Sequence, residues 1–476
     1  MAVKFGTSGL RGLSVELVGS VSALHATAFA RHLLAKGMAL PGSPVLVARD
    51  FRPSSPEIAA TVMAALSRAG LTPFDCGAIP TPALALYGLK LGAAGLMITG
   101  SHIPADRNGI KFYRPDGEID KGDEDAITAL AAELVDDEDA NRVEAGTGDD
   151  HFEAADALFA ARNHAILADG TLKGLRIGVY QHSTVARDMM VSVFQHYGAE
   201  VLALGRSDVF IPVDTEAVSA ATEKLMIDWS KKYRLDAIVS TDGDGDRPLV
   251  ADERGVPLRG DLLGLVAARF LDARLVATPV TSNSGLEAAG EFEVVRTKVG
   301  SPYVIAAMNV ALAAGKTGVL GFEANGGLML GSDFEVEGRK IAALPTRDSF
   351  LPALAVLYGA VSKKITLSGL AESYSLPVAR ADRIENFAQE KSAALMAYLR
   401  TSRENLGVFL APIGAVKDFS DIDGLRVTLA DDSVIHFRPS GNAPEMRCYV
   451  EAKNAETADA LLSRGLQRIA SWQAPA

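Results

Sequence analysis

The sequence predicts an α/β protein of several domains that ends in a smaller α+β domain. Short apolar strands alternate with amphipathic segments through the first three quarters of the chain, which is the pattern of parallel α/β sheets. Three of these strands run straight into polar loops that contain glycine. Near residue 370 the alternation stops, and closely spaced strands follow it.

Length and charge limit the possible functions. A chain of 476 residues is too long for one core, and about 100 to 200 residues per domain suggests three or four domains. Its 48% hydrophobic and 22% charged residues are typical of a globular protein. The net charge of -12 argues against broad binding to nucleic acid or anionic membranes. An anionic ligand must therefore be held by a local cluster of Arg and Lys.

The cysteines and the N-terminal sequence indicate the compartment. Cys76 and Cys448 are the only two cysteines and lie far apart in the chain, which fits a reducing compartment and gives no zinc spacing. No signal peptide is recognisable before Phe5, and no apolar run reaches the ~20 residues of a membrane span. We expect a cytoplasmic protein without membrane or nucleic-acid partners, as a monomer or small homo-oligomer.

The elements can be placed along the chain from their apolar spacing. Helical spacing is clear at residues 56–69 and 261–270, and we expect their apolar faces to belong to the core. The clearest strands are short apolar runs at residues 45–47, 96–98, 177–179, 237–239 and 318–320.

The last quarter follows a different pattern. Apolar runs at residues 425–429, 434–437 and 446–452 predict an antiparallel meander, and Asp431-Asp432 forms a turn within it. A closing helix is expected from about Glu456. This combination is an α+β domain.

Changes in composition suggest the domain boundaries. Residues 136–150 are acidic, contain glycine and lack a strong strand signal, so they read as a linker. A second boundary falls near residues 254–257 and a third around 367–375. The expected domains are residues 1–150, 151–255, 256–370 and 371–476.

The most informative stretch is Asp-Gly-Asp-Gly-Asp-Arg at residues 242–247, directly after a predicted strand. Glycines between the carboxylates let the backbone fold tightly, so that the three side chains Asp242, Asp244 and Asp246 can turn toward one divalent cation. An EF-hand would need glycine at the sixth loop position, where Arg247 stands, although Glu253 does fall at the twelfth. A calcium loop and a plain acidic turn remain as less favoured alternatives.

A second candidate is Ser101, between Gly100 and His102 just past a strand. A hydroxyl in this place can stand exposed for phosphoryl or acyl transfer. His102 is expected not to turn back as its base, and the Gly-x-Ser-x-Gly pattern of a nucleophile elbow is absent. Read alone, the serine is better explained as a structural turn. Beside the aspartate loop, a phosphoserine would supply the missing oxygen ligand for magnesium.

A third strand of this kind runs into the loop Glu323-Ala324-Asn325-Gly326-Gly327. Ligands of open α/β sheets gather beyond the carboxyl ends of strands. We therefore expect the serine loop, the aspartate loop and this third loop to face one cleft.

Two further loops carry phosphate-binding side chains. Residues 438–447 place Ser, Asn and two arginines between prolines that stiffen the loop, which suits the anchoring of a phosphate that does not react. Residues 5–12 combine glycines with Thr7, Ser8 and Arg11. The second segment is equally consistent with an N-terminal turn.

Together these residues resemble the α-D-phosphohexomutase superfamily, most closely its bacterial phosphomannomutase and phosphoglucomutase branch. The resemblance covers essentially the whole chain, because four signatures occur in order, one in each expected domain: residues 99–104, 242–247, 323–327 and 438–447. It implies three similar α/β domains with mixed sheets and a C-terminal α+β domain around a central cleft.

The resemblance also implies roles for individual residues. Ser101 would carry the phosphoryl group, and the three aspartates would bind Mg²⁺ with one phosphoserine oxygen. Arg247 would neutralise that phosphate, Lys111 would be the general acid/base with Arg11 assisting, and His102 would belong to the catalytic residues. The implied substrate-binding residues are Thr7, Ser8, Lys298, Glu323, Asn325, Arg438, Ser440, Gly441, Asn442 and Arg447.

The resemblance implies that the protein is an isomerase of hexose phosphates, with mannose phosphates as the first candidate substrates. Mannose 6-phosphate and mannose 1-phosphate would interconvert through a phosphoserine enzyme and a hexose 1,6-bisphosphate, which also serves as activator. The loop at Glu323 lacks the Ser and His of many relatives, which disfavours phosphoglucosamine mutase and leaves mannose versus glucose open. Phosphoglucomutase or dual-specificity activity is the first alternative, followed by a metal-dependent phosphatase and by a binding protein without catalysis.

Overall fold

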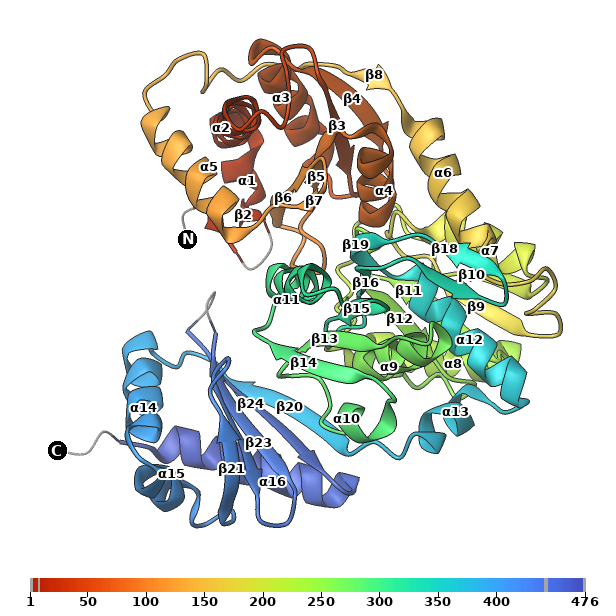
Figure 1. The fold of residues 1–476 in the computed structure, drawn as a ribbon, viewed down its shortest axis with the longest axis vertical. Coiled ribbons are helices and arrows are strands. Elements are labelled where there is room, and N and C mark those ends of the chain that lie inside the picture. The colour runs from red at the N-terminus through yellow and green to blue at the C-terminus, as the bar shows by residue number, and fades with distance from the viewer. Residues whose placement is uncertain (1–2, 7–8, 441–443, 474–476) are drawn as a thin grey trace. The chain divides into compact units, whose positions relative to one another are not determined.

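The computed structural model describes residues 3–6, 9–440 and 444–473. They form two compact units (Figure 1). Unit 1 contains the residues up to Val276 together with Gly300–Ser373. Unit 2 contains Ala277–Val299 and the residues from Tyr374 onward.

The first sheet of unit 1 is mixed, with strand order β1-β2-β6-β5-β3-β4-β8. β3 runs parallel to β4 and β5, whereas β6 is antiparallel to β5 and β7 pairs with β6. β5 is a continuous apolar run that is buried throughout, as expected for a strand covered on both faces. The strands are β1 (Lys4–Phe5), β2 (Leu10–Leu13), β3 (Pro44–Arg49), β4 (Thr72–Gly77), β5 (Ala94–Ile98), β6 (Arg107–Arg114), β7 (Gly117–Glu118) and β8 (Asp149–Asp150).

Helices α2, α3 and α5 pack side by side in this part of unit 1 (Figure 1). α3 begins with Pro56 in its first turn, where the missing N–H has no partner to lose. Its Ile58, Val62 and Leu66 recur every four residues on the buried face. The helical segments are α1 (Ser14–Glu16), η1 (Leu17–Val21), α2 (Ser22–Ala35), α3 (Ser55–Arg68), α4 (Thr81–Leu91), α5 (Lys121–Glu133) and α6 (Phe152–His164).

The second sheet of unit 1 has the order β10-β9-β11-β12. β9 is parallel to β10 and β11, and β12 returns antiparallel to β11 after the aspartate loop. Ala237 to Thr241 are fully buried, so the chain enters that loop from the core. The elements are β9 (Arg176–Tyr180), α7 (Arg187–His196), β10 (Glu200–Leu204), α8 (Ala220–Tyr233), β11 (Ala237–Thr241) and β12 (Pro248–Ala251).

The rest of unit 1 contains the loop at Glu323. β15 pairs antiparallel with β16, and β16 pairs antiparallel with β19. Helices α9 and α12 pack together beside these strands. The elements are α9 (Gly260–Phe270), β13 (Leu275–Pro279), α11 (Ser301–Ala313), β15 (Val319–Phe322), β16 (Leu328–Leu330), β17 (Phe334–Val336), β18 (Arg339–Ile341), β19 (Leu344–Asp348), α12 (Phe350–Lys363) and α13 (Leu367–Ser373), and the division between the units falls within β13.

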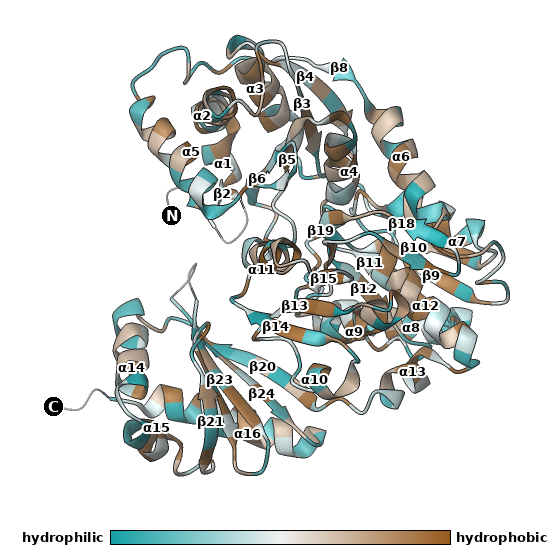
Figure 2. Cartoon of the chain, viewed as in Figure 1, coloured by the Kyte–Doolittle hydropathy of each residue, from teal (hydrophilic) through white to brown (hydrophobic). Residues whose placement is uncertain are grey.

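Unit 2 contains an antiparallel sheet of order β20-β24-β23-β22-β21. Its apolar residues gather on the sheet and on the facing side of α16, and Figure 2 shows both brown and teal segments on the strands. The elements are α10 (Leu286–Ala289), β14 (Glu293–Thr297), β20 (Val378–Ile384), α14 (Gln389–Thr401), α15 (Arg403–Leu410), β21 (Val416–Ser420), β22 (Leu425–Leu429), β23 (Val434–Pro439), β24 (Met446–Ala452) and α16 (Ala455–Ser471).

The expected elements are confirmed, with small shifts at their ends. The helix expected at 56–69 is α3, the one at 261–270 is α9, and the closing helix is α16. Each expected strand is present, although Gly318 stays outside β15 because it adopts a φ of 61°. The expected linker also differs at its end, where β8 pairs with β4.

Among the described residues, we find no single helix long and apolar enough to cross a membrane. The apolar helices α12 and α13 pass the test of length and composition only when taken together, and they meet at a 90° bend.

Candidate active site

The serine loop leaves the end of β5 in a strained conformation. Ser101 has a φ of 54°, in the left-handed region that residues with side chains seldom adopt. The Thr99 hydroxyl oxygen accepts a hydrogen bond from the Ser101 amide at 2.7 Å. Non-glycine residues held in such conformations cluster at functional sites.

Arg52 holds the serine loop from beneath. Its guanidinium is buried and donates to the carbonyl oxygens of Ser101 at 3.0 Å and Ile103 at 2.6 Å, while its Nε donates to Asp50 at 3.1 Å. A Cβ at Gly100 would lie only 2.5 Å from the Arg52 Cζ atom. Glycine at position 100 therefore makes room for the arginine that fixes the loop.

The aspartate loop turns between β11 and β12. Asp242, Asp244 and Asp246 are fully buried, and one oxygen of each lies within 4.8 Å of those of the other two. The amides of Asp246 and Arg247 both donate to Asp242 Oδ1 at 3.2 Å. The residue between the second and third carboxylates, Gly245, has a φ of 75°, so the expected glycine-assisted turn is present.

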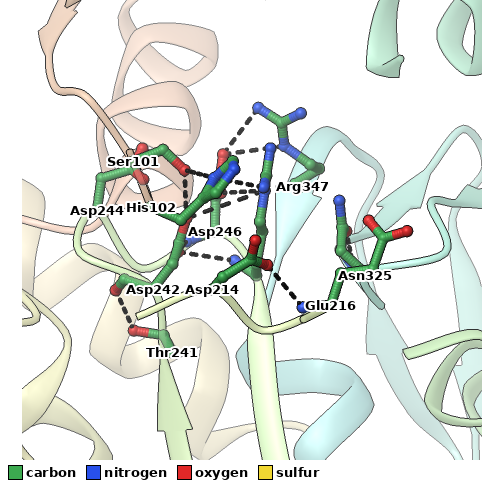
Figure 3. Close-up of polar contacts among 12 residues, drawn as sticks. Ser101, His102, Asp214, Glu216, Thr241, Asp242, Asp244, Asp246, Asn325 and Arg347 are labelled. Atoms are coloured by element: carbon green, nitrogen blue, oxygen red, sulfur yellow. Dashed lines mark hydrogen bonds and ion pairs between the residues drawn. The ribbon is translucent and has the colours of Figure 1, made fainter. Parts of the chain in front are cut away.

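The serine and aspartate loops meet in unit 1 (Figure 3). Ser101 Oγ donates to Asp242 Oδ2 at 2.5 Å. Burial, and then the neighbouring Asp244 and Asp246, raise the pKa of Asp242 well above its usual range. The acidic trio and the candidate phosphoryl carrier therefore share one buried site.

His102 lies close to Ser101, and the expectation that it does not serve as the base of Ser101 stays a prediction. Its Nδ1 atom lies 3.4 Å from Ser101 Oγ. Nδ1 also accepts a hydrogen bond from Arg247 Nη1 at 2.6 Å. Burial and the charge of Arg247 lower the pKa of His102 to about 3, so the imidazole is neutral near pH 7. Its engaged Nδ1 makes it a poor base for Ser101.

Lys111 reaches the same carboxylates from β6. Its Nζ donates to Oδ2 of both Asp244 and Asp246. The Thr81 hydroxyl adds a hydrogen bond to Asp244 Oδ2 at 2.5 Å. Arg11 lies behind the serine loop and donates to the Thr99 carbonyl oxygen. Burial lowers the pKa of Arg11 to about 10, with nearby arginines adding to the effect.

The carboxylates fit a hard divalent cation. Oδ2 of Asp244 and Asp246 is occupied by Lys111 and other donors, but their Oδ1 atoms are buried with no hydrogen-bond partner among the described residues. Buried acceptors without partners are costly. Carboxylate oxygens are the ligands that Mg²⁺ prefers, so Asp242, Asp244 and Asp246 could hold such an ion.

The third loop turns between β15 and β16. Asn325 Oδ1 accepts from the Gly327 amide at 3.0 Å, and Gly326 adopts a φ of 87°. Helix α9 begins at Gly260, close to this turn. A Cβ on Gly260 would lie only 2.2 Å from the Asn325 carbonyl carbon, so glycine allows the close approach. Glu323 accepts from Arg347, which joins this loop to the aspartate loop. The three loops are therefore in contact through Ser101, Asp246 and Arg347, and the expectation that they face one cleft stays a prediction.

Arg347 and Thr81 were missed by the sequence reasoning. Arg347 stands near the end of β19 and is only 2% exposed. The sequence does carry a signal for Arg347: the charged pair Arg347-Asp348 stands at the end of a strand, shortly before the apolar helix α12. Thr81, next to a proline at the start of α4, carried no comparable signal.

The predicted substrate-binding residues Lys298, Arg438, Ser440 and Arg447 lie in unit 2. Arg438 on β23 is paired in register with Arg447 on β24. Arg438 contacts Asp423 at 3.0 Å, and the Ser440 amide donates to the Glu445 carbonyl oxygen at 2.9 Å. The other predicted substrate-binding residues, Thr7, Ser8, Gly441 and Asn442, lie outside the described residues.

Comparisons with known proteins place this geometry in a family. Residues 2–137 match the model of phosphoglucomutase/phosphomannomutase, alpha/beta/alpha domain I, and residues 259–376 match that of domain III. A phosphomannomutase of Sinorhizobium fredii is 60% identical over 466 residues, which cover 98% of each chain. The chain belongs to the phosphoglucomutase/phosphomannomutase family.

Other members of the phosphoglucomutase/phosphomannomutase family match over the same length. A phosphomannomutase of Salmonella muenchen is 43% identical and covers 98% of this chain and 96% of its own. The crystal structure of a putative phosphomannomutase from Thermus thermophilus superposes with a TM-score of 0.76 at 22% identity, covering 99% of this chain and 100% of the other. That likeness concerns the fold.

Proposed function

We propose that this chain is a phosphomannomutase that interconverts mannose 6-phosphate and mannose 1-phosphate. The observation that carries the proposal is the Ser101 hydroxyl held against Asp242, in a chain 60% identical over its length to a phosphomannomutase. A buried serine beside three carboxylates is suited to carrying a phosphoryl group next to a metal ion. The reaction is an isomerisation by phosphoryl transfer.

We assign the metal site to Asp242, Asp244 and Asp246, with one oxygen of a phosphorylated Ser101 as a further ligand. The two unpartnered Oδ1 atoms support this assignment. Mg²⁺ bound there would offset negative charge on the transferring phosphoryl group. Phosphorylation removes the hydroxyl proton of Ser101. Asp242 Oδ2, which accepts a hydrogen bond from that hydroxyl in this structure, then becomes available to the metal ion.

The protein residues supply positioning and proton transfer. In the transfer, the bond between phosphorus and Ser101 Oγ breaks, a bond to a sugar hydroxyl oxygen forms, and the hydroxyl proton leaves. We assign acceptance of that proton to the neutral amine of Lys111, with Arg11 assisting. Lys111 Nζ donates to Asp244 and Asp246 in this conformation, so it must first leave one proton on a carboxylate and then move to reach the sugar. Arg247 and His102 would orient the phosphoserine, since both lie beside Ser101 and Asp242.

The remaining assignments concern substrate binding. We propose that Glu323 and Asn325 bind sugar hydroxyls and that Lys298 lines the site. The phosphate that does not react would be anchored by the loop with Arg438, Ser440, Gly441, Asn442 and Arg447, and Thr7 and Ser8 would contact phosphate at the other end. The paired arginines on β23 and β24 support a phosphate anchor.

The proposal also includes a bisphosphate intermediate and the division of the chain into four domains. A hexose 1,6-bisphosphate would be formed, turn, and return its other phosphate to Ser101, so it should also activate the enzyme. Each of the five sheets in the described residues falls within one of the ranges 1–150, 151–255, 256–370 and 371–476, which supports these ranges as the four domains.

Glucose phosphates remain the first alternative substrates, because the loop at Glu323 does not by itself separate the two epimers. A coupled assay compares mannose 1-phosphate with glucose 1-phosphate, with and without Mg²⁺ and catalytic hexose bisphosphate. We expect turnover that needs Mg²⁺ and favours mannose 1-phosphate. Absence of turnover on both would contradict the proposal, and release of inorganic phosphate without isomerisation would indicate a phosphatase.

A further inference from the structure

Arg347 bonds directly to both the metal loop and the loop at Glu323. Its Nε and Nη2 atoms each lie 2.9 Å from Asp246 Oδ2. Its Nη1 atom donates to Glu323 Oε2 at 2.9 Å. A single planar guanidinium thus spans the two carboxylates, and Figure 3 shows it beside Asp246.

The position of Arg347 is fixed by a second layer of contacts. Nη1 also lies 3.3 Å from Ser301 Oγ, and that hydroxyl donates to Glu118 Oε2 at 2.9 Å. Glu118 Oε1 accepts from Thr346, the residue before Arg347, at 2.9 Å. Such a buried charge is tolerated only when its partners are held in good geometry. These contacts hold the guanidinium between the two loops.

Arg347 also determines which oxygen Asp246 presents. Lys111 and Arg347 both donate to Oδ2, so the carboxylate is turned with Oδ1 free of hydrogen bonds. That oxygen lies 3.9 Å from Arg247 Nε, and it is the one that we assign to the ion. Any movement of Glu323 that shifts the guanidinium will change this orientation.

We propose that Arg347 is a positioning residue that couples metal binding at Asp246 to sugar binding at Glu323. Occupancy of one loop changes the affinity of the other, because both carboxylates share one guanidinium. This inference rests on the proposed function, which supplies the metal ion and the sugar. Coupling of this kind is reciprocal.

The test measures binding directly rather than turnover. Mn²⁺ is titrated by electron paramagnetic resonance into Ser101→Ala protein, which cannot turn over, with and without saturating mannose 1-phosphate. In this parent we expect the sugar phosphate to change the Kd for Mn²⁺ by about fivefold or more. In Ser101→Ala/Arg347→Met, we expect Mn²⁺ to bind about tenfold more weakly than in the parent. The Kd values for Mn²⁺ with and without mannose 1-phosphate should then differ by less than about twofold.

Three control variants sharpen the result. Arg339→Met removes an arginine that pairs with Glu337 outside the site, and it should leave both Kd values unchanged. Arg347→Lys keeps the positive charge but loses the planar guanidinium that binds two carboxylates at once. Compared with Arg347→Met, it should restore part of the Mn²⁺ affinity but not the coupling. Glu323→Gln should remove the coupling while preserving most of the Mn²⁺ affinity, and it decides the question if Arg347→Met does not fold.

The outcomes separate this inference from the proposed function. A parent that binds no Mn²⁺ or no mannose 1-phosphate would defeat the proposed function. A parent that binds both without coupling, or whose coupling survives in Arg347→Met and Glu323→Gln, would defeat only the role of Arg347.

Discussion

The Ser101 hydroxyl donates a 2.5 Å hydrogen bond to Asp242 Oδ2, although 141 positions separate the two residues in the chain. Each residue stands just past the end of a strand, Ser101 after β5 and Asp242 after β11. The two strands belong to different sheets, so neither sheet by itself contains both groups. Their meeting makes the candidate active site.

Ser101→Ala should abolish isomerisation. Removal of the hydroxyl that we assign to carry the phosphoryl group should lower kcat by about 10³-fold or more, as for other enzymes that lose their nucleophile. Mass spectrometry should also find no phosphoserine at this position. Ser362→Ala, which removes an exposed hydroxyl from α12, is the matched control. Near-normal turnover in Ser101→Ala would refute the phosphoserine assignment.

Mg²⁺ should stabilise the folded protein through the three aspartates. A ligand that binds only the native state adds about 2.7 kcal/mol to the free energy of unfolding at a concentration of 100 times its Kd. Differential scanning fluorimetry should show Tm rising with Mg²⁺ and returning with EDTA. In Asp244→Asn the rise should vanish, whereas Asp228→Asn, at an exposed ion pair on α8, should retain it. An equal rise in both variants would place the ion elsewhere.

His182 should make unit 1 less stable in acid. It is fully buried, and its Nε2 atom lies 2.9 Å from the Thr241 carbonyl oxygen, just before the aspartate loop. Burial lowers the pKa of His182 to about 4. Between pH 6.5 and 4 the unfolded chain therefore binds a proton that the folded chain does not, and the free energy of unfolding falls as pH falls, by at most about 1.4 kcal/mol per pH unit.

Urea unfolding of wild type and His182→Gln at pH 7.5 and pH 5 measures this effect. The glutamine can still donate to Thr241, so we expect a smaller loss of stability in acid than in wild type. His196→Gln, on the partly exposed end of α7, is the control. A variant as acid-sensitive as wild type would show that His182 is not the responsible group.

Gly260→Ala should disturb the loop at Glu323. The new Cβ would lie 2.2 Å from the Asn325 carbonyl carbon and 2.3 Å from the Gly326 amide nitrogen, so backbone must move. We expect a loss of about 1 to 3 kcal/mol in the free energy of unfolding, measured in urea, and a higher KM for mannose 1-phosphate. Gly407→Ala on α15, with open space around its Cβ position, should be neutral or stabilising. An unchanged KM would mean that this loop does not bind the sugar.

Much of the fold could be predicted from the sequence, because local patterns carry it. The buried strand β5 is a continuous apolar run, β11 begins with one, and α3 repeats its apolar residues every four positions. The metal-loop candidate was equally local, since Asp242, Asp244 and Asp246 lie within five residues. The contact between His102 and Ser101 could not be predicted in this way, because it depends on the backbone conformation of the serine loop.

The sequence by itself determined the strands, the helices and the reactive groups, because hydrophobic period, glycine and carboxylate spacing act over a few residues. Only the tertiary structure decided which groups meet. Arg347 bonds to Asp246 and Glu323 across 101 and 24 positions, and no short-range pattern encodes such contacts. They exist because separate sheets in unit 1 bring their strand ends together, where burial forces each charge to find its partner.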